Sequence, residues 1–75
     1  MANVNFSHMA AKWPSSIVAR EKVGEFTGGI LNPKTLANLD ATGEGPQERV
    51  AIGRKIGYPV EPFIAWLESR SRRLV

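Results

Sequence analysis

Apolar residues in the first third of the chain recur every three to four positions and predict a short helix over residues 18–27. Val23 and Phe26 lie three positions apart on its apolar face, and charged residues fill the other sides. Gly24 costs about 1 kcal/mol inside a helix relative to alanine, so we expect a second helix to approach closely at this point. The two glycines at 28–29 are expected to end the helix.

A second helix is expected to begin at an Asn-Pro step. Asn32 is a favoured N-cap residue and Pro33 suits the first helical position, which predicts a helix over residues 33–41. Leu36 and Leu39 form its apolar edge. The stripe opposite these leucines is polar and is expected to face solvent.

Residues 49–58 alternate between apolar and polar side chains on both sides of Gly53, which predicts a β-hairpin. A two-residue turn beginning at this glycine would pair Ala51 with Ile56. A three-residue turn would instead pair Ile52 with Ile56 and place four apolar side chains on one face. We favour the three-residue turn because it gathers the larger apolar set.

The last helix is expected over residues 60–70, because apolar residues there follow the positions i, i+3, i+4 and i+7. These residues are Val60, Phe63, Ile64 and Leu67. Residues 1–14 show neither period and are expected to form a flexible arm. The order of helix, glycine turn, helix, hairpin and helix predicts one α+β domain over residues 15–73, a winged helix–turn–helix.

Composition narrows the classes of function. The chain has 75 residues, no cysteine and a formal net charge of +3. The lack of cysteine excludes disulfides, zinc knuckles and thiol nucleophiles. Enzymes usually need a walled pocket of about 300 Å³ or more, which a chain this short rarely builds. We therefore expect a binding module and no enzyme, with no cofactor, no metal and no small-molecule ligand.

The expected cellular location follows from two kinds of segment that the sequence does not show. No apolar run reaches the roughly 18 residues that a membrane span needs, and no basic–apolar–small signal peptide is visible. We therefore expect a cytoplasmic protein with no membrane partner.

Several short motifs agree in order and spacing with one family. The segment IVAREKVGEFTGGILNPKTLANLD, followed by VAIGRKIGYPVEPFIAWLESR, resembles the small MerR-like winged helix–turn–helix proteins. This family includes phage excisionases and short prophage transcriptional regulators. The matching motifs are the Asn-Pro and Thr-Leu steps at 32–36, the Ile-Gly-Arg-Lys-x-x-Tyr run at 52–58 and the Trp-Leu pair at 66–67. The chain departs from the family in about two extra turn residues, roughly 29–30.

The resemblance implies sequence-specific binding to double-stranded DNA. It implies the role of an excisionase-type recombination accessory factor or of a prophage transcriptional regulator, and the sequence does not separate the two. An integrase, or further copies of the chain on adjacent sites, would be the protein partner and would strengthen weak binding by one copy.

The outward stripe of the second helix carries the candidates for base recognition. Lysine contacts guanine, asparagine forms two hydrogen bonds with adenine, and the threonine methyl group contacts thymine. Lys34, Thr35 and Asn38 are therefore candidate base readers, although an ordinary solvated helix face has the same composition. Asn32 caps the helix and is a candidate phosphate contact, since a helix N-terminus attracts anions.

The hairpin carries the candidate contacts to the DNA backbone. Arg49, Arg54 and Lys55 are expected to hold phosphates or enter the minor groove. Charged residues also protect a hairpin edge from aggregation, which is the alternative reading of the same three cations. Tyr58 is expected at the core or its edge, with its hydroxyl free for a phosphate.

A protein-interaction module with the same fold is the alternative function. Asp40, Glu44 and Glu48 place acidic groups close to the second helix, and an exposed Trp13 would suit a protein contact. Binding that persists at high salt would favour this alternative.

Overall fold

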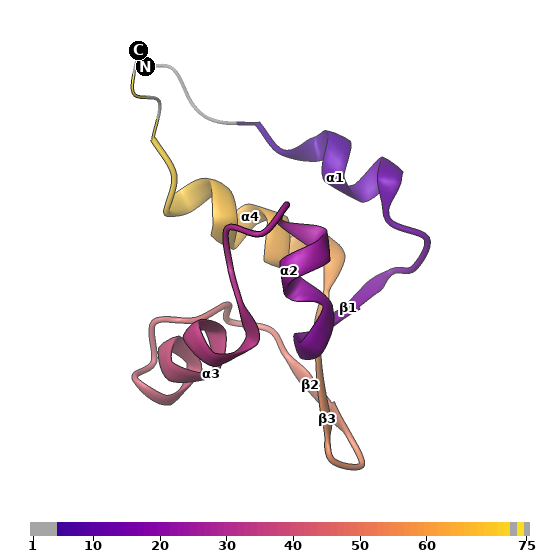
Figure 1. Ribbon diagram of the computed structural model, residues 1–75, viewed down its shortest axis with the longest axis vertical. Helices are drawn as coiled ribbons and strands as arrows, with labels where there is room; N and C mark the ends of the chain where they lie inside the picture. Colours follow the sequence, from indigo (N-terminus) through magenta and orange to yellow (C-terminus); the bar gives the residue numbers. More distant parts are fainter. Residues whose placement is uncertain (1–4, 73, 75) are drawn as a thin grey trace.

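The computed structural model describes residues 5–72 and 74, and within them the chain is a small α+β domain (Figure 1). The helices are α1 (Ser7–Lys12), the 3-10 turn η1 (Arg20–Lys22), α2 (Val23–Phe26), α3 (Pro33–Ala41) and α4 (Val60–Ser69). The strands are β1 (Ile17–Ala19), β2 (Val50–Ile52) and β3 (Lys55–Pro59). In this described part of the chain, no helix is long and apolar enough to cross a membrane.

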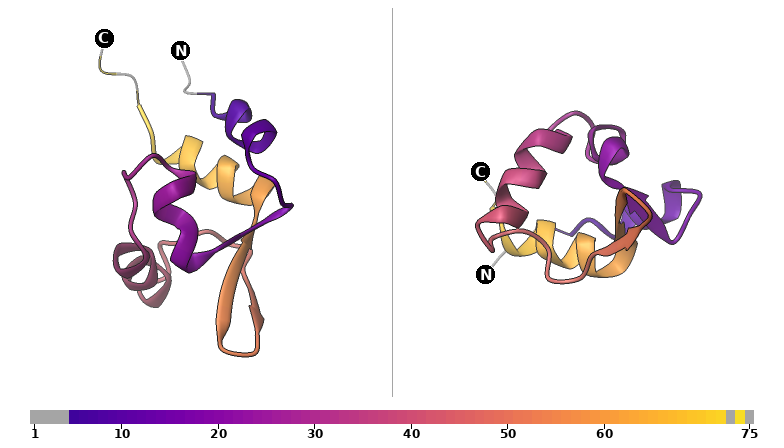
Figure 2. Two further views of the ribbon diagram at one scale, coloured as in Figure 1. Left: turned by 45° about the vertical axis from the view of Figure 1, so that its right-hand side comes forward. Right: turned by 90° about the horizontal axis from the view of Figure 1, so that it is seen from below.

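The three strands form one antiparallel sheet in the order β1-β3-β2, with β3 in the centre. Val18 of β1 pairs with Tyr58 of β3, and both side chains are fully buried. Figure 2 shows the β2–β3 hairpin projecting from the body of the domain, with α3 to one side of it. The sheet therefore presents one face to the core and extends a free hairpin beyond it.

The hairpin has the two-residue turn, so our preference for three residues is wrong. Ile52 pairs with Lys55 and Ala51 pairs with Ile56. Gly53 has a φ of 62°, the left-handed conformation that glycine adopts readily at the first position of a tight hairpin turn. The conformational preference of the turn residues determines the register, because β2 is an exposed edge strand whose side chains would gain no burial from the alternative pairing.

The flexible arm predicted for residues 1–14 is also wrong where the structure describes it. Residues 7–12 form α1, and apolar side chains around this helix pack against the core. These side chains are Phe6, Met9, Ala10 and Trp13, which follow the spacing i, i+3, i+4 and i+7. This helical period is present in the sequence, where polar residues separate its apolar members. The boundary at 14–15 thus separates no arm from the domain, whereas residues 1–4 and Arg73, which ends the predicted domain, lie outside the described residues.

The first predicted helix is shorter than residues 18–27. Its opening residues form β1 instead, and α2 begins only at Val23. The β-branched pair at 17–18 favours a strand, and β3 offers it a partner. Gly24 does not meet a second helix, since an added Cβ would lie 3.5 Å from the Leu31 carbonyl oxygen, an ordinary contact. The glycines at 28–29 both have positive φ values and follow the end of α2 as predicted.

The second and last helices are confirmed. α3 spans the predicted residues 33–41, and α4 ends one residue before the predicted limit. Their apolar faces meet in a core built around stacked aromatic rings. Phe63 lies between Phe26, Tyr58 and Trp66, with ring centroids 5.5, 5.2 and 5.8 Å away. These stacked rings pack α4 against α2 and against the central strand β3.

Candidate nucleic-acid interface

The polar face of α3 is exposed as predicted. The Asn32 side-chain oxygen accepts a hydrogen bond from the Thr35 backbone N–H at 2.8 Å, which confirms the predicted N-cap. Lys34, Thr35 and Asn38 are all exposed, whereas Leu36 is fully buried on the opposite side. The structure therefore brings the three candidate base readers together on one accessible helix face.

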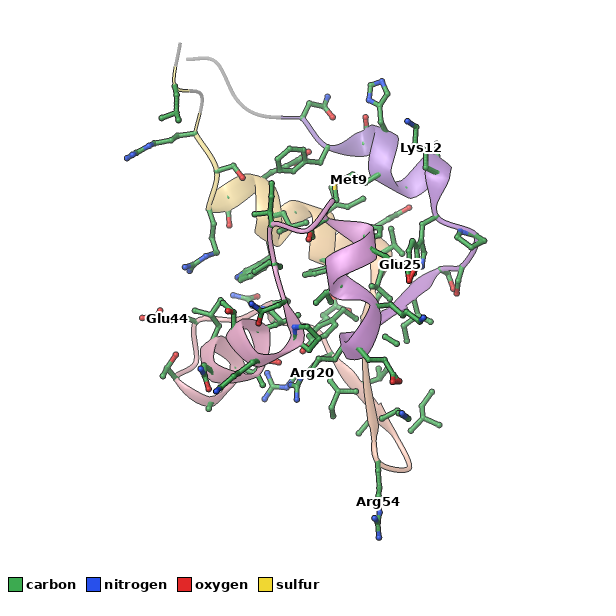
Figure 3. All side chains as sticks on the ribbon, viewed as in Figure 1. Met9, Lys12, Arg20, Glu25, Glu44 and Arg54 are labelled. Atoms are coloured by element: carbon green, nitrogen blue, oxygen red, sulfur yellow. The ribbon has the colours of Figure 1, made fainter. Side chains whose placement is uncertain are left out.

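The hairpin turn carries Arg54 at its tip, where the side chain points away from the body of the domain (Figure 3). Lys55, beside it, forms an exposed ion pair with both carboxylate oxygens of Glu21, at 3.0 and 2.8 Å. The hydrogen bond from Lys55 lowers the pKa of the Glu21 carboxyl group. Exposed pairs of this kind contribute little to stability, so Lys55 can exchange Glu21 for a phosphate at small cost.

A cleft of about 190 Å³ separates the hairpin from the start of α3. Pro33 lines it on the α3 side, Arg54 and Lys55 line it on the hairpin side, and Arg20 and Glu21 contribute from η1. The first residue of α3 and the cationic tip of the hairpin thus border a single hollow, whereas Lys34, Thr35 and Asn38 do not line it.

Behind this surface lies a hydrogen-bonded cluster of three side chains from distant parts of the sequence. The Tyr58 hydroxyl donates to Asp40 Oδ2 at 2.5 Å and accepts from Arg20 Nε at 2.9 Å. Arg20 Nη2 also bonds Asp40 Oδ2 directly, at 2.6 Å. Figure 3 shows Arg20 between the start of α2 and α3. The cluster ties α3 to the central strand of the sheet.

Two of the predicted DNA contacts belong to this cluster. Tyr58 is fully buried and both of its hydroxyl interactions are made within the protein, so the prediction that its hydroxyl is free for a phosphate is wrong. Arg49 Nη1 lies 3.8 Å from Asp40 Oδ1, and its side chain keeps 46% exposure. Arg49 therefore stays at the surface, but its guanidinium group forms a long ion pair with the buried carboxylate of Asp40.

Asp40 and Arg20 are members of this cluster that the sequence did not single out as site residues. The sequence predicts Asp40 only as an acidic group close to the second helix that would suit a protein contact, yet its side chain is only 5% exposed. It lies four residues after Leu36, and side chains at i and i+4 share one helix face. That spacing was the available signal. Gly45 completes the arrangement, because a Cβ at this position would overlap Asp40 Oδ1.

Burial is the main reason that the pKa of Tyr58 rises to about 12, and the hydrogen bond to Asp40 adds to the shift. The hydrogen bond to Tyr58 in turn raises the pKa of Arg20. At neutral pH the cluster therefore combines a neutral phenol with the Arg20 guanidinium, which the carboxylate of Asp40 faces. This arrangement is suited to holding elements together.

Because Tyr58 is the single tyrosine of the chain, its titration can be observed directly. We expect phenolate absorbance to appear with a midpoint near pH 12 in the folded protein and near pH 10 in denaturant. Since the folded state binds this proton more tightly, stability is fully present below about pH 10 and falls as the pH rises toward 12. The Tyr58→Phe variant should lack this loss, and a folded-state midpoint at 10 would contradict the buried cluster.

The described residues contain no group of three or more histidine, cysteine, aspartate or glutamate side chains that could hold a metal ion. The side chains that the fold gathers at the surface are polar and basic, as on Lys34, Asn38 and Arg54. Such groups bind anions and hydrogen-bond to base edges.

Comparison with known proteins adds no relative. No family model, no curated protein and no solved structure matches this chain.

Proposed function

We propose that this chain binds double-stranded DNA in a sequence-specific manner, as a winged helix–turn–helix without catalytic activity or a cofactor. α3 would enter the major groove, and the β2–β3 hairpin would act as the wing on the neighbouring backbone or minor groove. The observation that carries this proposal is the exposed face of Lys34, Thr35 and Asn38 on a helix that borders the same cleft as Arg54.

The order of elements supports the same interpretation. α2, a glycine turn, α3 and a β-hairpin follow one another along the chain, as a winged helix–turn–helix requires. Six residues, 27–32, join the two helices, whereas such turns commonly have three or four. Asn32 is the last residue of this link and caps α3, so the first residue of the helix is well defined despite the longer turn.

The role within DNA biology rests on the sequence resemblance. We propose an excisionase-type recombination accessory factor or a small prophage transcriptional regulator, acting in the cytoplasm with an integrase or with further copies on adjacent sites.

One argument for the protein-interaction alternative was an exposed Trp13, and the structure does not support it. Trp13 packs edge-on against Phe26 and donates a hydrogen bond to the Ile17 carbonyl oxygen, so it covers the core.

Salt dependence measures the phosphate contacts. Lys34, Arg49, Arg54 and Lys55 are the candidate cations, and four phosphate contacts made by them predict a slope of log K against log salt near −4. Glu21→Gln frees Lys55 from its ion pair, so we expect tighter binding to random DNA at low salt. Glu25→Gln is the matched control, because Glu25 pairs with Lys22, which is not a candidate DNA contact. Equal effects of the two substitutions on DNA affinity would show that Lys55 does not contact the DNA.

Replacing Asn38 by alanine tests base recognition. On the specific site, which binding selection from random duplexes would identify, we expect a loss of about 1–3 kcal/mol, with little change on random DNA. Gln47→Ala is the control, because Gln47 is an exposed amide outside α3. Equal losses on both DNAs would show that Asn38 contacts no base.

A further inference from the structure

Positive side chains gather at the cleft between the hairpin and the start of α3. Arg20, Arg54 and Lys55 line this cleft, and Glu21 is the one acid among its lining residues. Two other hollows on the described part of the surface are lined by Glu48 and by no cation. The cleft therefore favours an anion, whereas these two hollows disfavour one.

Arg20 differs from the two hairpin cations because the interior of the domain fixes its side chain. Its Nε donates to the Tyr58 hydroxyl at 2.9 Å, and its Nη2 donates to Asp40 Oδ2 at 2.6 Å. Both acceptors are buried. Arg54 and Lys55, by contrast, are exposed at the end of the hairpin. A guanidinium group held by two hydrogen bonds loses little conformational freedom when it binds a ligand.

One edge of the Arg20 guanidinium group is left for a ligand. Arginine has N–H groups on all three guanidinium nitrogens, and no group in the described part of the chain accepts a hydrogen bond from Nη1. Within that part, Asp40 Oδ1 is the single buried side-chain nitrogen or oxygen atom without a partner, so Nη1 is open to solvent. Nη1 and Nη2 are adjacent donors, which match two oxygens of a phosphate group.

The cleft holds two further groups that suit a phosphate. Pro33 lines it as the first residue of α3, a helix of nine residues whose N-terminus carries a partial positive charge. Lys55 lines it as well, and its ammonium group already binds an anion there, the Glu21 carboxylate, at 2.8 Å. A phosphate oxygen would take the place of this carboxylate when Glu21 turns away.

We propose that the cleft binds one phosphate group, with Arg20 as a fixed ligand and Lys55 as a ligand that exchanges Glu21 for it. The inference rests on the proposed function for the source of the phosphate, which would be one phosphodiester of a DNA strand. Arg20 would bind the phosphate that Lys55 neutralises, so the number of neutralised phosphates and the salt slope near −4 stay the same.

Asp40 and Tyr58 are then positioning residues, which touch no ligand but orient Arg20. Because the Asp40 carboxylate balances the charge of Arg20, the contribution of Arg20 comes from the direction of its donors more than from net charge. Lysine carries the same charge as arginine but lacks the planar pair of donors. Arg20→Lys therefore separates the geometry of the site from its charge.

Titration of the full ¹⁵N-labelled chain with inorganic phosphate, at constant ionic strength, tests the site without DNA. We expect saturable shifts of the Arg20 guanidinium group and of the amides of residues 20–21 and 54–55, with a dissociation constant on the order of 10 mM. Arg20→Lys should weaken phosphate binding about fivefold. Arg49→Lys is the matched control, because Arg49 also faces Asp40, at 3.8 Å, but does not line the cleft.

Two further variants separate the roles of the neighbouring groups. Glu21→Gln frees Lys55 and should strengthen phosphate binding about twofold. Tyr58→Phe removes the acceptor of Arg20 Nε but keeps the bond to Asp40, and should weaken phosphate binding about twofold. Near-ultraviolet circular dichroism verifies that each variant is folded. Phosphate that does not saturate the cleft, or equal effects of Arg20→Lys and Arg49→Lys on its affinity, would overturn the proposal.

A duplex of about 20 base pairs identifies the source of the phosphate. Arg20→Lys should weaken binding about fivefold on random and specific DNA alike, because a phosphate contact carries no sequence information. A duplex that binds Arg20→Lys as tightly as the unchanged chain would overturn the phosphate site and leave the proposed function standing. A chain that binds inorganic phosphate in the cleft but no duplex would uphold the site, contradict the proposed function, and assign the cleft to a free phosphate or phosphate ester.

Discussion

Replacing Asp40 by alanine is expected to lower the free energy of unfolding by about 3 kcal/mol. The carboxylate receives hydrogen bonds from Tyr58 and Arg20, and its loss leaves a buried hydroxyl without its acceptor. Breaking a fully buried ion pair costs about 3–5 kcal/mol, and the lower end applies here because the Arg20 side chain keeps 27% exposure. Urea denaturation followed by tryptophan fluorescence measures the change.

Two further variants make this result specific. Glu44→Ala removes an exposed acid close to α3 and should change stability by no more than about 0.5 kcal/mol. In a double-mutant cycle, Asp40→Ala and Tyr58→Phe should be strongly non-additive because the two groups share one hydrogen bond. Additive losses, or a loss for Asp40→Ala as small as that for Glu44→Ala, would contradict the cluster.

Replacing Leu36 by alanine is expected to cost about 2–5 kcal/mol, the range for truncating a buried leucine. Leu36 is fully buried, and α3 has only one other buried side chain, that of Asp40. The substitution therefore leaves a cavity and removes the main apolar contact of this helix. The same denaturation experiment measures the loss, and hydrogen exchange of the α3 amides shows whether the helix opens locally.

Leu39→Ala provides the comparison within the same helix. Leu39 is half-buried, so its truncation removes less apolar contact and should cost less than that of Leu36. The opposite order would mean that α3 packs through its other side. The candidate base readers would then not face solvent as described.

The sequence predicted best those elements whose signals are local and agree with each other. α3 has an Asn-Pro start, a side-chain cap and two leucines at helical spacing, and its bounds were predicted correctly. α4 has a complete apolar stripe. The three exposed candidates on α3 follow from helix geometry alone, because Leu36 fixes which side is inward.

The predictions from the sequence are wrong where the local structure is determined by pairing with a segment far away in the sequence or by a competing local preference. β1 is too short to be recognised in the sequence, and it exists because β3 pairs with it. The hairpin register followed the glycine conformation at the turn, since no burial favoured the alternative. The helical spacing of α1 is present in the sequence, but the polar residues between its apolar members weaken the pattern.

The site was predicted in part for the same reason. Lys34, Thr35 and Asn38 depend on one helix, whereas Tyr58 and Arg49 meet a carboxylate from another element. The burial of Asp40 results from the packing of α3 against the sheet, and pairing between residues 18–38 positions apart leaves no local pattern in the sequence.

DNA binding itself is tested most directly by titrating the ¹⁵N-labelled chain with a duplex of about 20 base pairs of arbitrary sequence at low salt, because the nonspecific electrostatic attraction is visible there. We expect amide shifts clustered at residues 32–38 and 53–55, diminishing as salt is added. The absence of shifts at low salt, or shifts confined to α1 and α4, would contradict the proposed interface.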